Sequence, residues 1–130
     1  MKSEHRARVS RGAFSAGQII VVDWRGDGLP KEANKSRPCV VVEDSVLFDP
    51  TYPNVIVVPL ADDDEYVVAA LSVEIRPTAE NGCKKTCYAM GHAVVTASKR
   101  RISKVTDARV TGDELRAIRK CIAESLGITR

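Results

Sequence analysis

The sequence predicts a mainly β domain with one C-terminal helix, built as a small, strongly bent antiparallel sheet or open barrel. The first observation is a series of short apolar runs, rich in β-branched residues and separated by segments containing Gly, Pro and Asp. The second is a single amphipathic stretch that starts near Thr111. At 130 residues the chain has the length of one domain, which we expect over residues 17–130.

The expected strands follow the apolar runs. Residues 39–42 form an unbroken run, which predicts a central strand buried on both faces and opened by Pro38. The other expected strands are 17–24, 54–60, 66–75 as one long strand or a bent pair, 88–97, and a short last strand at 101–105. The polar loop at 25–36 is long for a compact domain, and loops of that length are often functional.

The C-terminal segment predicts one helix with both of its ends marked. Thr111 and Glu114 have the spacing of a capping box, and Gly127 is placed to end the helix. One apolar stripe at helical spacing is expected to pack on the sheet, formed by Leu115, Ile118, Ile122 and Leu126.

The net charge of +3 is carried by the N-terminal segment. Residues 1–16 hold four basic side chains and one acidic one and are predicted to be a disordered basic tail, whereas the rest holds 16 of each sign. Net charge therefore does not indicate a nucleic-acid partner, and only local clusters can. No apolar run approaches the ~20 residues of a membrane span, and no apolar stretch follows the basic start as in a secretory signal. We expect a cytoplasmic protein with no membrane partner.

Arg37 lies at the mouth of the predicted central strand, where the following proline restricts its backbone. A guanidinium held there can bind a phosphate. Glu32 lies five residues upstream, in the long polar loop. This pair could perform acid–base chemistry on a phosphodiester; the alternative interpretation is a surface ion pair at a strand start.

Five segments, taken in order, resemble the MazF/PemK family of type II toxins. They are Gly17 to Asp23 with Ile19 and Val22, then Glu32 with Arg37-Pro38 before three valines, then Val58-Pro59-Leu60, then Lys99, Arg101 and Ile102, and lastly Leu126-Gly127-Ile128. The resemblance covers about residues 17–128. It implies an SH3-like barrel of the MazF/CcdB type that pairs as a homodimer. It also implies a toxin that cleaves single-stranded RNA without a metal or other cofactor and is silenced by an antitoxin chain in the RNA groove.

The resemblance also assigns catalytic roles. In metal-free cleavage the neighbouring 2′-OH attacks the phosphate, which requires a base, a proton donor and a cation on the crowded phosphate. By position, Arg37 would stabilise the phosphorane and Glu32 would be the base. Relatives often carry Thr or Ser after the third strand, but here Ala61 stands there, followed by Asp62.

His92 is the third catalytic candidate, because relatives often carry a glutamine there and an imidazole can exchange protons near neutral pH. The alternative is a histidine with a purely structural role. On the expected strand 88–97, His92 would share a face with Thr96 and Ser98.

The remaining candidates would bind RNA. They are Lys35, Ser36, Thr96, Ser98, Lys99, Arg100, Arg101 and, as a stacking platform, Trp24. The alternatives are a solvated basic turn at residues 99–101 and a core role for Trp24.

Cys83 and Cys87, with His92 beyond them, superficially resemble part of a zinc site. A structural zinc needs four ligands, and the fourth would have to come from Cys39 or Cys121, so no metal is predicted. A disulfide within this loop under oxidising conditions is the alternative.

Two other functions remain open at this stage. One is a gyrase-binding toxin of the same fold, which would not need Arg37 or Glu32 for chemistry. The other is a catalytically weakened RNA-binding relative, an alternative motivated by Ala61.

Overall fold

The structure, a computed structural model, describes residues 14–24, 36–62 and 67–128. The strands are β1 (Gln18–Asp23), β2 (Ser36–Val41), β3 (Asn54–Ala61), β4 (Ser72–Ile75), β5 (Cys87–Met90), β6 (Val95–Ser98) and β7 (Ile102–Arg109). Short 3-10 turns lie between them: η1 (Ser45–Leu47), η3 (Ala69–Leu71), η4 (Gly91–Ala93) and η5 (Lys99–Arg101). Helix α2 (Gly112–Ser125) ends the fold.

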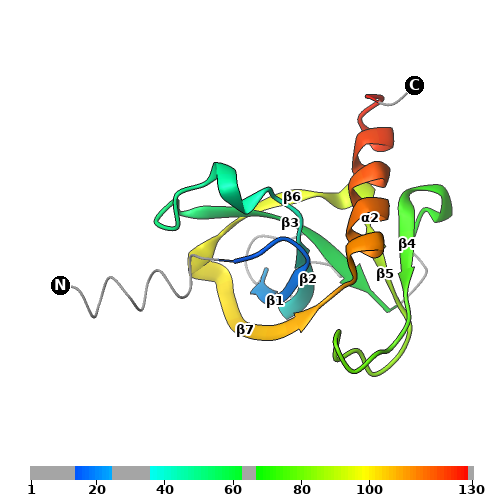
Figure 1. Cartoon of the computed structure of the whole chain (residues 1–130), viewed down its shortest axis with the longest axis horizontal. Helices are drawn as coiled ribbons and strands as arrows, with labels where there is room; N and C mark the ends of the chain where they lie inside the picture. Colours follow the sequence, from blue (N-terminus) through cyan, green and yellow to red (C-terminus); the bar gives the residue numbers. More distant parts are fainter. Residues whose placement is uncertain (1–13, 25–35, 63–66, 129–130) are drawn as a thin grey trace.

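The strands form one antiparallel sheet that bends around β3. The order is β4-β5-β3-β2-β1-β7, and β6 also pairs with β3. Strand β6 pairs with the first half of β3 and β5 with its last two residues, so two successive strands share one edge of β3. In Figure 1, β7 curves around β1 and β2 while β4, β5 and α2 lie together on one side. The predicted bent antiparallel sheet with a C-terminal helix is confirmed.

The central strand β2 is buried on both faces, as predicted. Val40 and Val42 belong to a core cluster that includes Ile118 of α2, whereas Cys39 and Val41 belong to a second cluster on the opposite face. Alternate residues of a strand point to opposite faces, so the uninterrupted apolar run serves two cores. This double burial fixes β2 as the rigid element beside which the site is built.

The expected strand 88–97 is wrong as one element, because the chain turns in the middle. Strand β5 ends at Met90, η4 follows, and β6 begins at Val95. Gly91 is buried where η4 packs against α2, and the turn moves the chain from the C-terminal end of β3 to its N-terminal half. The apolar residues on both sides of the turn made it look like one strand in the sequence.

Two other strand boundaries differ from the expectation. Within the expected strand 66–75, residue 66 lies outside the described residues, η3 precedes the strand, and β4 covers only the last four residues. Strand β7 runs to Arg109, four residues beyond the expected end. Its second half is largely polar and alternates between partly buried and exposed residues, as suits an edge strand, so the apolar pattern ended before the strand did.

Helix α2 begins as predicted. The Glu114 N–H donates to Thr111 Oγ1 at 3.0 Å, and the Thr111 N–H donates to the Glu114 carboxylate at 2.9 Å. At the other end Gly127 has a φ of +74°, and its N–H donates to the Glu124 carbonyl. Leu126 is 63 % exposed, so its assignment to the buried stripe was wrong. Among the described helices, none has the length and apolarity needed to cross a membrane.

The packed part of the chain begins before residue 17. Phe14 is 3 % exposed in the second core cluster, and its carbonyl accepts a hydrogen bond from Ser45 Oγ at 2.7 Å. Residues 14–16, which the sequence placed in the basic tail, therefore belong to the fold. Residues 1–13 lie outside the described residues.

Candidate functional site

Arg37 is the second residue of β2 and pairs with Val22 of β1. The strand therefore begins before Pro38, earlier than the sequence indicated. On the other side of β2, pairing with β3 begins only at Cys39, opposite Pro59, although β3 runs on to Ala61. Residues 36–38 are therefore not paired with β3 and form a lip. Arg37 is half-buried there. Its backbone belongs to a strand whose last three residues, Cys39 to Val41, are buried in two cores.

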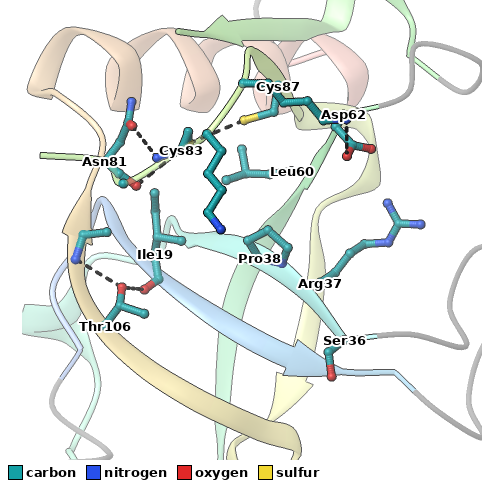
Figure 2. Close-up of a pocket in the computed structure, with 14 residues that line it drawn as sticks. Ile19, Ser36, Arg37, Pro38, Leu60, Asp62, Asn81, Cys83, Cys87 and Thr106 are labelled. Carbon is teal, nitrogen blue, oxygen red and sulfur yellow. Dashed lines mark hydrogen bonds and ion pairs between the residues drawn. The ribbon is translucent and has the colours of Figure 1, made fainter. Parts of the chain in front are cut away.

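A pocket with a volume of about 720 Å³ opens beside this lip (Figure 2). Its floor is largely apolar and includes Ile19, Pro38 and Leu60. Polar and charged groups surround the floor: Ser36, Arg37, Asp62, Asn81, Lys84, Lys85 and Thr106. A pocket of this size with an apolar floor and a few cationic groups at its rim suits a ligand that is both flat and anionic.

Asp62, not Ala61, faces this pocket. Leu60 and Asp62 line it, whereas Ala61 between them is 5 % exposed and pairs with Tyr88. The alternation of a strand explains the difference, because neighbouring residues point to opposite faces. The Asp62 carboxylate lies 3.3 Å from Lys85 Nζ, and both side chains are largely exposed. Ala61, which occupies the position where relatives often carry Thr or Ser, is therefore buried and does not face the pocket.

The loop opposite Arg37 supplies two lysines that the sequence analysis missed. Lys84 and Lys85 line the pocket from the segment between β4 and β5. Asn81 holds this loop: it is 4 % exposed, its Oδ1 accepts from the backbone N–H groups of Thr78 and Cys83, and its Nδ2 donates to the Arg76 carbonyl. The signal in the sequence is the adjacent lysine pair itself, which is shorter than the basic run at 99–101.

Two thiols form part of the same wall. The Sγ atoms of Cys83 and Cys87 are 3.7 Å apart, and both residues line the pocket (Figure 2). Burial raises the pKa of the Cys87 thiol to about 12, and the neighbouring Cys83 contributes in the same direction. Cys39 lies two residues after Arg37 in β2. Burial raises the pKa of its thiol to about 12 as well, so that thiol stays protonated. The described residues contain no group of three or more His, Cys, Asp or Glu that could hold a metal ion.

The structure does not bring His92 to the pocket. His92 is exposed in η4, which packs against α2, β3 and β4, and it is not on a strand as expected. The turn η4 joins β5 to β6, and both of these strands pair with β3 along the edge that faces away from β2. Arg37 and His92 are therefore separated by the width of β3.

The basic run at η5 is partly occupied by structural contacts. Lys99 Nζ donates to the Pro50 carbonyl at 3.1 Å and lies 5.8 Å from the Phe14 ring centroid. Arg101 Nη1 donates to the Asp23 carbonyl at 3.4 Å. Arg100 is exposed. Lys99 and Arg101 thus tie the turn between β6 and β7 to the segment before β3 and to the end of β1.

The other RNA-binding candidates are spread over the fold. Ser98 accepts a hydrogen bond from the Arg100 N–H as the cap of η5, and Thr96 is exposed on β6. Trp24 is partly buried against the second core cluster. Ser36 lines the pocket beside Arg37. Glu32 and Lys35 lie outside the described residues.

Comparison with known families decides the family to which this fold belongs. The family model described as "PemK-like, MazF-like toxin of type II toxin-antitoxin system" matches residues 15–126. The chain belongs to the PemK/MazF toxin family. Its sequence resemblance to that family is therefore confirmed over almost the whole described fold.

Solved structures of PemK/MazF toxins share the fold. MazF from Deinococcus radiodurans superposes with a TM-score of 0.70 at 14 % identity, covering 88 % of this chain and 97 % of that one. A mycobacterial endoribonuclease, solved in complex with its cognate antitoxin, gives 0.68 at 19 % identity, covering 91 % and 99 %. The Mycobacterium tuberculosis toxin MazF-mt6 gives 0.65 at 17 % identity, covering 87 % and 99 %. Comparison with curated protein sequences finds no match.

Proposed function

We propose that this PemK/MazF-family toxin is a metal-independent endoribonuclease that cleaves single-stranded RNA at the Arg37 pocket. The observation that carries the proposal is the arrangement of three cations, Arg37, Lys84 and Lys85, around one apolar-floored pocket. The chain is close to neutral outside its N-terminal segment, so this cluster is a local feature and not a consequence of net charge. The apolar floor suits a nucleobase, and the cationic rim suits its phosphates.

In the proposed reaction the 2′-oxygen next to the scissile phosphate attacks the phosphorus. The bond to the 5′-oxygen breaks and that oxygen takes a proton from a water molecule, leaving a 2′,3′-cyclic phosphate and a 5′-hydroxyl. Arg37 binds the phosphate oxygens and stabilises the charge that develops in the transition state. Glu32, outside the described residues, is the proposed base for the 2′-hydroxyl. Lys84 and Lys85 hold the flanking phosphates.

The test of this function is digestion of single-stranded RNA by the pure protein in a metal chelator. Cleavage with cyclic-phosphate ends is the expected result. RNA binding without cleavage would favour the weakened relative that Ala61 suggested. If RNA is neither bound nor cleaved while the protein inhibits DNA gyrase, the gyrase-binding alternative is correct and the ribonuclease proposal is wrong.

Lys84→Ala should weaken RNA binding while leaving the chemical step in place. Lys84 is proposed to contact a phosphate that flanks the reacting one, so its loss should raise KM more than it lowers kcat. The slope of log affinity against log salt should fall by about 0.7, as for one phosphate contact on a single strand. Lys120→Ala is the matched control, since Lys120 is an exposed lysine of α2 that does not line the pocket. Equal effects of the two variants would contradict the role of Lys84.

His92→Gln tests the proton donor proposed from the sequence. If His92 supplies the proton, the alkaline fall of the rate should disappear in this variant. Its position on the far edge of β3 leads us to expect the opposite, an unchanged rate and an unchanged alkaline limb. The measurement is the pH profile of kcat/KM for both proteins. A lost limb would restore His92 as the acid and would require a closer approach to the phosphate than the single chain shows.

We also propose that the toxin pairs as a homodimer and is neutralised by an antitoxin. Val46 and Leu47 in η1 are 90 % and 74 % exposed, which supports burial of this apolar turn against another chain. An acidic antitoxin segment that fills the Arg37 pocket would compete directly with RNA.

A further inference from the structure

We propose that Cys83 and Cys87 are an oxidisable dithiol that closes to a disulfide in the wall of the Arg37 pocket. The carrying observation is the 3.7 Å separation of their Sγ atoms at the surface of that pocket. Both are free thiols. The two remaining cysteines are placed differently: Cys39 is fully buried in β2, and Cys121 is buried on α2.

The two thiols differ in accessibility, and this difference gives each a role. Cys83 is only partly buried in the loop, whereas Cys87 is 7 % exposed and pairs with Ile75 in the β4–β5 ladder. Cys83 is therefore the thiol that an oxidant meets first, and Cys87 is the resolving thiol behind it. Burial raises the pKa of Cys87 to about 12, in agreement with a thiol that is protonated at rest.

The oxidant is a peroxide, and the reaction balances with hydrogen peroxide alone. The Cys83 sulfur attacks one peroxide oxygen, the O–O bond breaks, and Cys83 sulfenic acid and one water are formed. The Cys87 sulfur then attacks the Cys83 sulfur, and the S–O bond breaks. The departing hydroxide takes the Cys87 proton to form a second water. The two thiols lose two electrons, which reduce the peroxide.

We expect closure of the disulfide to move the loop that carries Lys84 and Lys85. A disulfide needs its sulfurs about 2.05 Å apart, so they must approach from their present separation. Cys87 is held by the sheet, so the movement falls on Cys83 and on the segment between them, which consists of Lys84, Lys85 and Thr86. If the pocket binds RNA, as in the proposed function on which this step rests, oxidation should weaken that binding.

The sequence allows a direct test of the linkage in the full chain. Digestion with trypsin and a glutamate-specific protease places each cysteine in its own peptide, with Cys83 in residues 81–84 and Cys87 in residues 86–99. After peroxide treatment and alkylation without reductant, these two peptides should remain joined, with the mass of two hydrogen atoms lost. Reduction should separate them. Cys83→Ala should abolish the linkage, and Cys121→Ala, the matched control, should retain it.

Cys83→Ala is the primary variant because the buried Cys87 is a core position where a substitution risks misfolding. Cross-links between chains through Cys83, or Cys83 overoxidised with Cys87 still alkylated, would overturn the dithiol. RNA affinity is measured on the reduced and oxidised proteins, and a several-fold rise in Kd on oxidation, absent in Cys83→Ala, is expected. An intact linkage with unchanged RNA affinity would overturn the regulatory consequence. A linkage in a protein that binds RNA in neither state supports the dithiol and contradicts the ribonuclease proposal.

Discussion

Arg37→Ala should abolish most of the RNA cleavage while the protein stays folded. If Arg37 stabilises the charge on the pentacoordinate phosphate, its loss should remove about 2–4 kcal/mol of transition-state stabilisation, a fall of roughly 30- to 1,000-fold in rate. The fold should survive, because Arg37 is only half-buried, whereas the cores are held by the four residues that begin at Cys39. The measurements are kcat/KM on single-stranded RNA and the free energy of unfolding.

Arg37→Lys separates charge from geometry. A lysine keeps the positive charge but cannot form the two parallel hydrogen bonds of a guanidinium, so this variant should also be strongly impaired. Its free energy of unfolding should match that of the wild type. Near-normal cleavage by Arg37→Ala with an unchanged unfolding curve would show that the reacting phosphate lies elsewhere.

Gly91→Ala should be the most destabilising small substitution on the side of the fold that packs against α2. A Cβ on Gly91 would lie 2.7 Å from the Cβ of Cys121 and 3.1 Å from the Leu71 carbonyl oxygen. Neither neighbour is a flexible side-chain end, so the helix or the turn must move, at a cost of about 1–3 kcal/mol. The measurement is the free energy of unfolding from urea titration.

Two comparisons make this result specific. Gly112→Ala is the matched control, because the added Cβ would meet only the end of the Arg116 side chain, at 3.8 Å. At the first position of α2, alanine should be neutral or stabilising. Combining Gly91→Ala with Cys121→Gly should cost less than the sum of the two single changes, because the clashing Cβ is removed. Equal stability of Gly91→Ala and the wild type would mean that η4 does not pack on α2 at this distance.

The parts of the fold that could be predicted are those in which one local signal decides the structure. The apolar run after Pro38 could only be a strand with two buried faces, and the pairing of Thr111 with Glu114 marks a helix start by mechanism. The turn at Gly91 could not be predicted, because glycine is required there by the approach of Cys121, which is distant in the sequence. The polar end of β7 was missed because an edge strand needs no apolar pattern.

The candidate site was predictable where a residue stands next to a strong local signal. Arg37 could be identified from its place before Pro38 at the mouth of the central strand as well as from the resemblance, and the structure places it beside a pocket. Asp62 and the loop that carries Lys84 and Lys85 were missed. They line the same pocket as Arg37 only because of the way β3 and the segment after β4 lie across the sheet. Ala61 drew attention as a departure from relatives, but the alternation of β3 turns the neighbouring residue to the pocket. The role proposed for Glu32 remains a prediction from the resemblance.

Because β5 and β6 both pair with β3, the length of β3 is constrained. Inserting one residue within β3 would reverse the side to which every following side chain points, sending Asp62 into the interior and Ala61 outward. The same insertion would shift two strand pairings at once. The segment between β4 and β5 carries no such double constraint beyond its Asn81 anchor, so insertions there reshape the pocket without altering the sheet. Divergence in what such toxins recognise should therefore accumulate in that segment, while the length of β3 stays fixed.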